Sequence, residues 1–234
     1  MKKVLIFSLT LILTFITIYT FTLDSPPVTV EFTPVGAEDG YLTMTGSSCA
    51  FDPILGVSKN GVTVAMGPRL WNPNISAASC YRAWTSWNVS SIPDGAKIID
   101  TKFTYHALIV NTAGFPNAPR AGTIYSLEHN PVGADPTTLR DDIRNGTQYV
   151  VNDPSFNELG IHTIDLGPLA DARLKSNLAI GWFGIGISHP DESTSVFKDM
   201  QYAASEDTSG NIVPTLSVTY STDIISNIFP PVTP

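Results

Sequence analysis

Short segments in which apolar and polar residues alternate run through most of this 234-residue chain. An alternation with a period of two residues is typical of an antiparallel strand with one buried face and one exposed face. Residues 101–110 and 215–220 show it most clearly. The residues predicted to face the core are Phe103, Tyr105, Ala107, Ile109, Leu216, Val218 and Tyr220.

Residues 178–187 are apolar on both faces. A strand in the centre of a sheet can be buried on both faces, so this pattern predicts a central strand. Gly181, Gly184 and Gly186 fall within the segment. Glycines inside a strand indicate a bulge or a close approach by neighbouring backbone, and we expect such a feature here.

Two short helices are predicted between the strands. Asp135 is placed to cap the first helix, because its carboxylate can accept hydrogen bonds from the first turn. Pro136 fits the first helical position, and the helix should stop near Asn145. Residues 168–175 form the second predicted helix.

Eighteen prolines and seventeen glycines suit an all-β domain with many turns. The predicted fold is all-β, a jelly-roll-like antiparallel β-sandwich with one or two short helices, preceded by an N-terminal signal or anchor helix. The predicted parts are a signal peptide or signal anchor (1–23), a stalk or edge strand (24–37), the β-sandwich domain (38–221) and a C-terminal tail (222–234).

The N-terminus predicts the compartment. Lys2 and Lys3 precede an uncharged apolar run over residues 4–23, a pattern of secretory signals and signal anchors. The run is long enough to span a bilayer, and no Ala-x-Ala cleavage site follows it, so both alternatives stay open. Either one makes the rest of the chain extracellular or exposed on the cell surface, in the second case with membrane anchoring through residues 4–23.

Cys49 and Cys80 are the only cysteines. In an oxidising compartment they are expected to form a disulfide, because no Cys-x-x-Cys or short-spaced histidine pair indicates a metal site. Three Asn-x-Ser/Thr sequons, at Asn74, Asn88 and Asn145, are candidate glycosylation sites.

The formal net charge is −8, which argues against nucleic acid as a partner. No cofactor is predicted. Four pairs of adjacent carboxylates are interpreted as solvated surface, although a structural calcium ion, which takes about six to eight oxygen ligands, stays open. The pairs are Glu38–Asp39, Asp141–Asp142, Asp191–Glu192 and Glu206–Asp207.

Residues 82–98 have a distinctive sequence, Arg-Ala-Trp-Thr-Ser-Trp-Asn-Val-Ser-Ser-Ile-Pro-Asp-Gly-Ala-Lys-Ile. This run resembles the Arg-x-(Tyr/Leu)-x-x-Phe-Asp-Leu-Ser-x-Ile-Pro-x-Gly-Ala-x-Ile run of DNRLRE-type domains, which are secreted β-sandwich modules also described as carbohydrate-binding modules. The order and spacing of the family's segments hold across roughly residues 38–221. The resemblance implies a β-sandwich fold and a carbohydrate-binding or surface role.

The chain departs from the family at two points. Trp87-Asn88 replaces the family's Phe-Asp, and Ala204-Ser205-Glu206 replaces its Ser-Arg-Glu, so the arginine is lost. If the family's Arg and Glu form a structural pair, Glu206 needs another partner, and Arg82 is one candidate.

Trp84 and Trp87 are three residues apart, so on one regular strand they face opposite sides. The resemblance places Trp87 at an inward position, which leaves Trp84 facing outward or under a covering loop. A flat exposed aromatic ring can stack on the apolar face of a sugar, and packing under loops is the alternative for Trp84 and Trp71. The candidate ligand-binding residues are Trp84, Trp71, Arg82 and His106, the last on the outward face of residues 101–110.

The sequence contains no Gly-x-Ser-x-Gly, His-Glu-x-x-His or P-loop motif, so we expect a protein that is not an enzyme. The first hypothesis is a non-catalytic extracellular or cell-surface module that binds carbohydrate of a cell wall or extracellular polymer. The alternative is a structural or adhesive subunit of a surface layer or filament, in which residues 28–32 and 224–229 add a strand to a neighbour's sheet.

Overall fold

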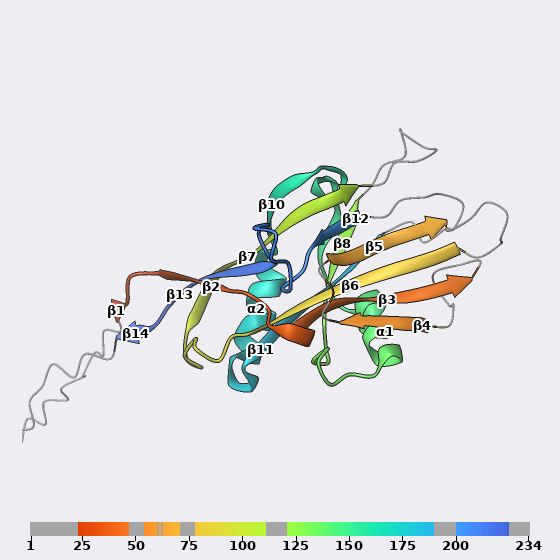
Figure 1. Ribbon diagram of the computed structural model, residues 1–234. Helices are drawn as coiled ribbons and strands as arrows, with labels where there is room; N and C mark the ends of the chain where they lie inside the picture. Colours follow the sequence, from red (N-terminus) through yellow and green to blue (C-terminus); the bar gives the residue numbers. More distant parts are fainter. Residues whose placement is uncertain are drawn as a thin grey trace, which may run out of the picture.

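Antiparallel strands make up most of the computed structural model shown in Figure 1. It describes residues 23–46, 54–59, 61, 63–70, 78–110, 121–189 and 200–224. The strands form a β-sandwich with two short helices, which confirms the predicted all-β class. The predicted N-terminal helix lies outside the described residues. Within them, no helix is long and apolar enough to cross a membrane.

Most of the elements are strands, and two helices and three 3-10 turns interrupt them. The helices are α1 (Pro136–Asn145) and α2 (Gly167–Asn177), and the 3-10 turns are η1 (Gly36–Glu38), η2 (Pro154–Asn157) and η3 (Leu178–Ile180). The strands are β1 (Leu23–Asp24), β2 (Val28–Phe32), β3 (Asp39–Gly46), β4 (Ile54–Lys59), β5 (Thr63–Leu70), β6 (Ala78–Asn88), β7 (Lys97–Val110), β8 (Gly122–Ser126), β9 (Gln148–Asp153), β10 (Gly160–Asp165), β11 (Trp182–Ser188), β12 (Met200–Ala203), β13 (Thr215–Ser221) and β14 (Asp223–Ile224).

Two long strands organise the two layers. In one layer, β7 pairs with β13 and β12 along one edge and with β10 along the other, and β2 lies outside β13. In the other layer, β6 lies between β3 and β11, with β4 outside β3 and β8 and β9 outside β11. β5 connects the layers, because it pairs with β12 through one half and with β6 through the other.

Alternating side chains of both layers form the main core. Trp87 of β6 is fully buried and contacts Phe103 of β7 edge to face, with the ring centroids 5.9 Å apart. The predicted inward positions of β7 and β13 are confirmed for Phe103, Tyr105, Ala107, Leu216 and Val218, which are buried. Tyr220 is partly buried against the same core.

The prediction for Ile109 is wrong, since its side chain is 40% exposed. Gln201 of β12 pairs with Ile109, whereas the next residue, Tyr202, pairs with Ala107. Leu108 is therefore an extra residue in β7. A bulge of this kind shifts the alternation of side chains by one position, so Ile109 leaves the inward face.

Helix α1 covers the outer face of the β6 layer and creates a second core. Asp135 caps it as predicted, accepting hydrogen bonds from the backbone N–H groups of Thr137 and Thr138. Ile143 of α1 packs so closely on Gly186 of β11 that a Cβ atom there would lie 2.5 Å from the Ile143 Cγ1 atom. The same Cβ atom would lie 3.1 Å from the Ile143 Cα atom, so the backbone of α1 also approaches this glycine closely, as predicted. The buried residues of the second core are Leu42, Trp84, Leu127, Leu139 and Ile143.

The predicted strand over residues 178–187 is shorter in the structure. Leu178–Ile180 form η3, and Gly181 follows it with a left-handed φ of 74°. β11 begins only at Trp182, and it is central as predicted, between β6 and β8. The apolar run therefore contains both a turn and a strand.

Cys80 is buried in β6 and is not a free cysteine. Cys49, its predicted partner, lies outside the described residues. The Cys49–Cys80 pairing stays a prediction.

Candidate functional site

Trp84 is fully buried, so the predicted sugar platform at this residue is wrong. Trp84 and Trp87 do occupy opposite faces of β6, as their spacing requires. Both faces are covered, however, because α1 packs over the Trp84 side and brings Leu139 and Ile143 against it.

The prediction that Arg82 binds ligand is also wrong. Arg82 lies on the same face of β6 as Trp84, is 1% exposed, and donates from Nη1 to the carbonyl oxygen of Arg140 in α1 at 3.1 Å. It therefore helps to hold α1 on the sheet. The carboxylate oxygens of Glu206 are buried without a hydrogen-bond partner, so the suggested Arg82–Glu206 hydrogen bond is not formed.

The remaining predicted site residues do not lie together in one site. His106 lies on the outer face of β7 beside Ile161 of β10, and it is partly exposed. Asn88 is exposed at the end of β6, where its Oδ1 accepts hydrogen bonds from the N–H and the hydroxyl of Ser90. Asn145 is exposed at the end of α1. Trp71 and Asn74 lie outside the described residues.

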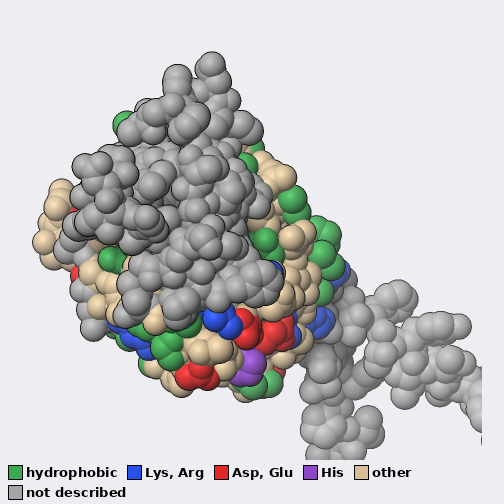
Figure 2. All heavy atoms as spheres, turned by 90° about the vertical axis from the view of Figure 1, so that its right-hand side faces the viewer, with side chains coloured by type: hydrophobic (Ala, Val, Ile, Leu, Met, Phe, Trp, Pro, Cys, Tyr) green, Lys and Arg blue, Asp and Glu red, His purple; other side chains and the backbone are tan. Residues whose placement is uncertain are grey.

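A pocket of about 320 Å³ lies beside the C-terminal end of α1. Charged side chains of both signs gather with a histidine on the lower part of the molecule, on the side of α1 (Figure 2). The residues that line the pocket are Glu128, Asp141, Asp142, Asn145, Gly146 and Thr147.

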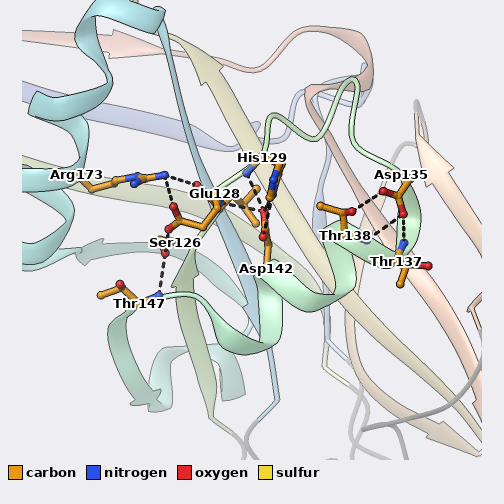
Figure 3. Close-up of polar contacts among 10 residues, drawn as sticks. Ser126, Glu128, His129, Asp135, Thr137, Thr138, Asp142, Thr147 and Arg173 are labelled. Atoms are coloured by element: carbon orange, nitrogen blue, oxygen red, sulfur yellow. Dashed lines mark hydrogen bonds and ion pairs between the residues drawn. The ribbon is translucent and has the colours of Figure 1, made fainter.

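Asp142 is buried beneath this pocket, so its interpretation as solvated surface is wrong. Its Oδ2 atom accepts hydrogen bonds from the backbone N–H groups of Glu128 at 2.9 Å and His129 at 2.8 Å (Figure 3). The His129 ring lies 3.2 Å from the same carboxylate. Asp142 thus ties α1 to the segment that follows β8.

Glu128 is held by two partners. Arg173 of α2 donates to its Oε2 atom at 2.7 Å, and the Ser126 hydroxyl donates to its Oε1 atom at 3.1 Å (Figure 3). The Ser126 hydroxyl also accepts from the N–H of Thr147 at 2.8 Å. The carboxylates of Asp142 and Glu128 therefore already have hydrogen-bond or ion-pair partners within the protein. No group of three His, Cys, Asp or Glu side chains among the described residues could hold a metal ion.

Asp142→Ala is expected to lower the free energy of unfolding by about 2 kcal/mol, because two partly buried N–H groups lose their charged acceptor. Urea denaturation measures this loss. Asp141→Ala is the matched control: Asp141 is exposed and contacts only the neighbouring Arg140 in an ion pair, so its loss should stay below about 0.5 kcal/mol. Equal losses for the two variants would contradict the anchoring role of Asp142.

In the pair Glu38–Asp39, the interpretation of Asp39 as solvated surface is also wrong, because its side chain is buried. It is 1% exposed, and its two carboxylate oxygens accept hydrogen bonds from the backbone N–H and the hydroxyl of Ser205 at 2.8 and 2.9 Å. Burial raises the pKa of Asp39 to about 6, against the opposing effect of the Ser205 hydrogen bonds, and the nearby carboxylate of Glu206 adds to the rise. Of the two other pairs interpreted as solvated surface, Asp191–Glu192 lies outside the described residues. The interpretation is wrong for Glu206, whose carboxylate oxygens are buried, whereas Asp207 is partly exposed.

The outer side of the β7 layer presents hydroxyl groups on four neighbouring strands. The threonine and serine side chains that carry these hydroxyl groups are partly or fully exposed. Some are linked across strands: the Thr104 and Thr163 hydroxyls are 2.9 Å apart, and those of Thr29 and Thr219 are 2.8 Å apart. We call this surface the hydroxyl face, and it consists of Thr29, Thr104, Thr163, Thr215, Ser217 and Thr219.

The site residues predicted from the sequence do not include the hydroxyl face, although the sequence contains a signal for it. Thr215, Ser217 and Thr219 occupy every second position of β13, opposite the inward residues. What the sequence could not show is that Thr104, Thr163 and Thr29 lie on the same side of adjacent strands.

No known protein family and no curated protein sequence matches this chain. The antiparallel β-sandwich class therefore stands on the structure itself.

Proposed function

We propose that this protein is a non-catalytic extracellular or cell-surface module that binds carbohydrate of a cell wall or extracellular polymer through the hydroxyl face. The proposal keeps the jelly-roll-like, DNRLRE-type resemblance of residues 38–221 and the export signal or anchor of residues 1–23. It moves the ligand site away from Trp84 and Arg82, which lie under α1.

The observation that carries the proposal is an exposed array of hydroxyl groups, which shares its face with the charged residues Glu31, Asp100 and Lys102. Each hydroxyl can donate one hydrogen bond and accept others, which suits a ligand that is itself covered with hydroxyl groups. Neighbouring strands lie about 4.8 Å apart, so hydroxyls from several strands can contact one polysaccharide chain. His106 and Ile161 border the array and add apolar surface for the C–H groups of a sugar.

The double variant Thr104→Val with Thr163→Val is expected to weaken polysaccharide binding at least about tenfold, by analogy with losing one or more net hydrogen bonds. It removes both partners of one hydroxyl pair, so no buried polar group is left unpaired and stability should change little. Affinity electrophoresis in gels that contain neutral or acidic polysaccharides measures the effect.

Thr137→Val is the matched control, because Thr137 is exposed on α1, away from the hydroxyl face, and its hydrogen bond to Asp135 uses only the backbone N–H. It should bind like the wild type. Absence of binding by the wild type to every polysaccharide would remove the proposed function. Binding that survives the double variant would remove the hydroxyl face as its site.

A second candidate function is a structural or adhesive subunit that assembles by strand addition. It is favoured by the edge position of β2 and by the pairing of β1 with β14, which brings the two ends of the described chain together at one end of the molecule (Figure 1). Of the two apolar segments that support this alternative, residues 28–32 form β2, whereas residues 225–229 lie outside the described part.

A further inference from the structure

Strand β2 presents a regular free edge. It pairs with β13 over all five residues without a register shift, and no strand of the described chain pairs with its other edge. β9, the strand at the opposite end of the sheet path, is a poorer edge for pairing. It has a left-handed residue, Asn152, and two irregularities in its register with β8, and such features oppose strand addition.

The sequence of β2, Val-Thr-Val-Glu-Phe, is complementary to itself in the antiparallel direction. We propose that the free edge of β2 pairs antiparallel with β2 of a second copy of this chain, with Val30 opposite Val30. Thr29 then faces Glu31 of the other copy, where its hydroxyl can donate to the carboxylate. Val28, which is 50% exposed, faces Phe32 of the other copy. No like charges stand directly opposite each other.

Other symmetric registers are worse. Centring the pair on Glu31 places two carboxylates opposite each other, which is destabilising. Centring it on Thr29 leaves only three pairs of residues. A register centred between Thr29 and Val30 places an outward residue of one copy beside an inward residue of the other, because side chains alternate with a period of two. The register centred on Val30 keeps the faces aligned and uses all five residues.

The proposed β2–β2 pairing is limited in length and in the number of copies, and it extends the proposed binding surface. Pro26 and Pro27 precede β2 and Pro34 follows it, and proline cannot donate to a ladder of hydrogen bonds, so the contact stops after five residues. A two-fold contact uses the same edge on both copies, which closes the assembly at a dimer. The strand order across the contact is then β13, β2, β2, β13, so Thr29 of each copy lies beside β2 of the other, Thr219 lies one strand further out, and the two hydroxyl faces join.

The inference rests on the second candidate function, assembly by strand addition. Its test uses the full chain in mild detergent, by sedimentation velocity over a concentration series. Thr29→Glu places one carboxylate opposite Glu31 of the other copy at each of the two symmetry-related positions and should raise the dimer Kd about tenfold. Adding Glu31→Lys restores opposite charges at both positions and should return the Kd to within about threefold of the wild type. Thr163→Glu, on the β10 edge, is the matched control and should leave the Kd unchanged.

The rescue by the double variant depends on the register, because only pairing of position 29 with position 31 brings the new charges together. A wild-type dimer that Thr29→Glu weakens and the double variant restores supports the proposal. A dimer that responds to Thr163→Glu but not to Thr29→Glu overturns it and leaves strand addition at another edge. A wild type that stays monomeric at every concentration overturns both this proposal and the second candidate function. Thermal unfolding of each variant shows that the fold is retained.

Discussion

Replacing Trp84 with alanine is expected to lower the free energy of unfolding by about 3–5 kcal/mol, the usual range for truncating a large buried aromatic side chain. Trp84 is fully buried between β6 and α1, and its loss would leave a cavity beside Leu139 and Ile143. Because this second core helps to hold α1 on the sheet, the change should also loosen the pocket beside α1. Urea denaturation followed by far-UV circular dichroism measures the loss.

Two further variants make this expectation specific. Trp87→Ala removes an equally buried ring from the main core and should cost a similar amount. Trp84→Phe should cost much less than Trp84→Ala, because it keeps most of the ring and removes an indole N–H that has no hydrogen-bond partner. A Trp84→Ala variant that loses less than about 1 kcal/mol would mean that α1 does not cover this face of β6.

The stability of the protein is expected to fall by about 2–3 kcal/mol, through Asp39 alone, as the pH rises from below 4 to above 6. Burial raises the pKa of Asp39 from 3.8 in the unfolded chain to about 6 in the folded protein. Below pH 4 the carboxyl is protonated in both states and has no effect. Between the two pKa values the folded state binds more protons than the unfolded state, so raising the pH favours unfolding. Each unit of difference corresponds to about 1.4 kcal/mol.

The comparison with Asp39→Asn isolates this effect from other titrating groups. Asparagine has nearly the same shape as aspartic acid and does not ionise. The unfolding free energy of the variant should therefore depend less on pH than that of the wild type. The difference in unfolding free energy between the two proteins, measured in urea across pH 3–8, should shift in favour of the variant as the pH rises. A difference that stays constant between pH 4 and pH 7 would show that Asp39 ionises without cost in the folded state.

Features that depend on neighbours in sequence could be predicted directly. The N-cap at Asp135 is one, because its carboxylate contacts only the next two or three N–H groups. The alternation in β7 is another, and it holds until the extra residue at Leu108 interrupts it. A bulge depends on how β12 pairs with β7, and the sequence of β7 alone contains no sign of it.

The candidate sites were harder to predict, because their exposure depends on distant segments. The alternation in β6 places Trp84 and Trp87 on opposite faces, but it does not say that a helix 50 or so residues later covers one of them. Likewise, Asp39 is buried through its contact with Ser205, which is 166 residues away. Adjacent carboxylates are usually solvated, so the sequence favoured the surface interpretation.

By itself, therefore, the sequence determined the all-β class, most inward positions of the strands and the start of α1, since side-chain period and helix capping act over a few residues. Only the tertiary structure decided which strand faces stay exposed. It buried Trp84, Arg82 and Asp39, and it aligned the hydroxyl groups of β2, β13, β7 and β10 on one surface. The reason is that the order of strands in a sheet is set by pairings between distant segments, and these pairings leave no local pattern in the chain.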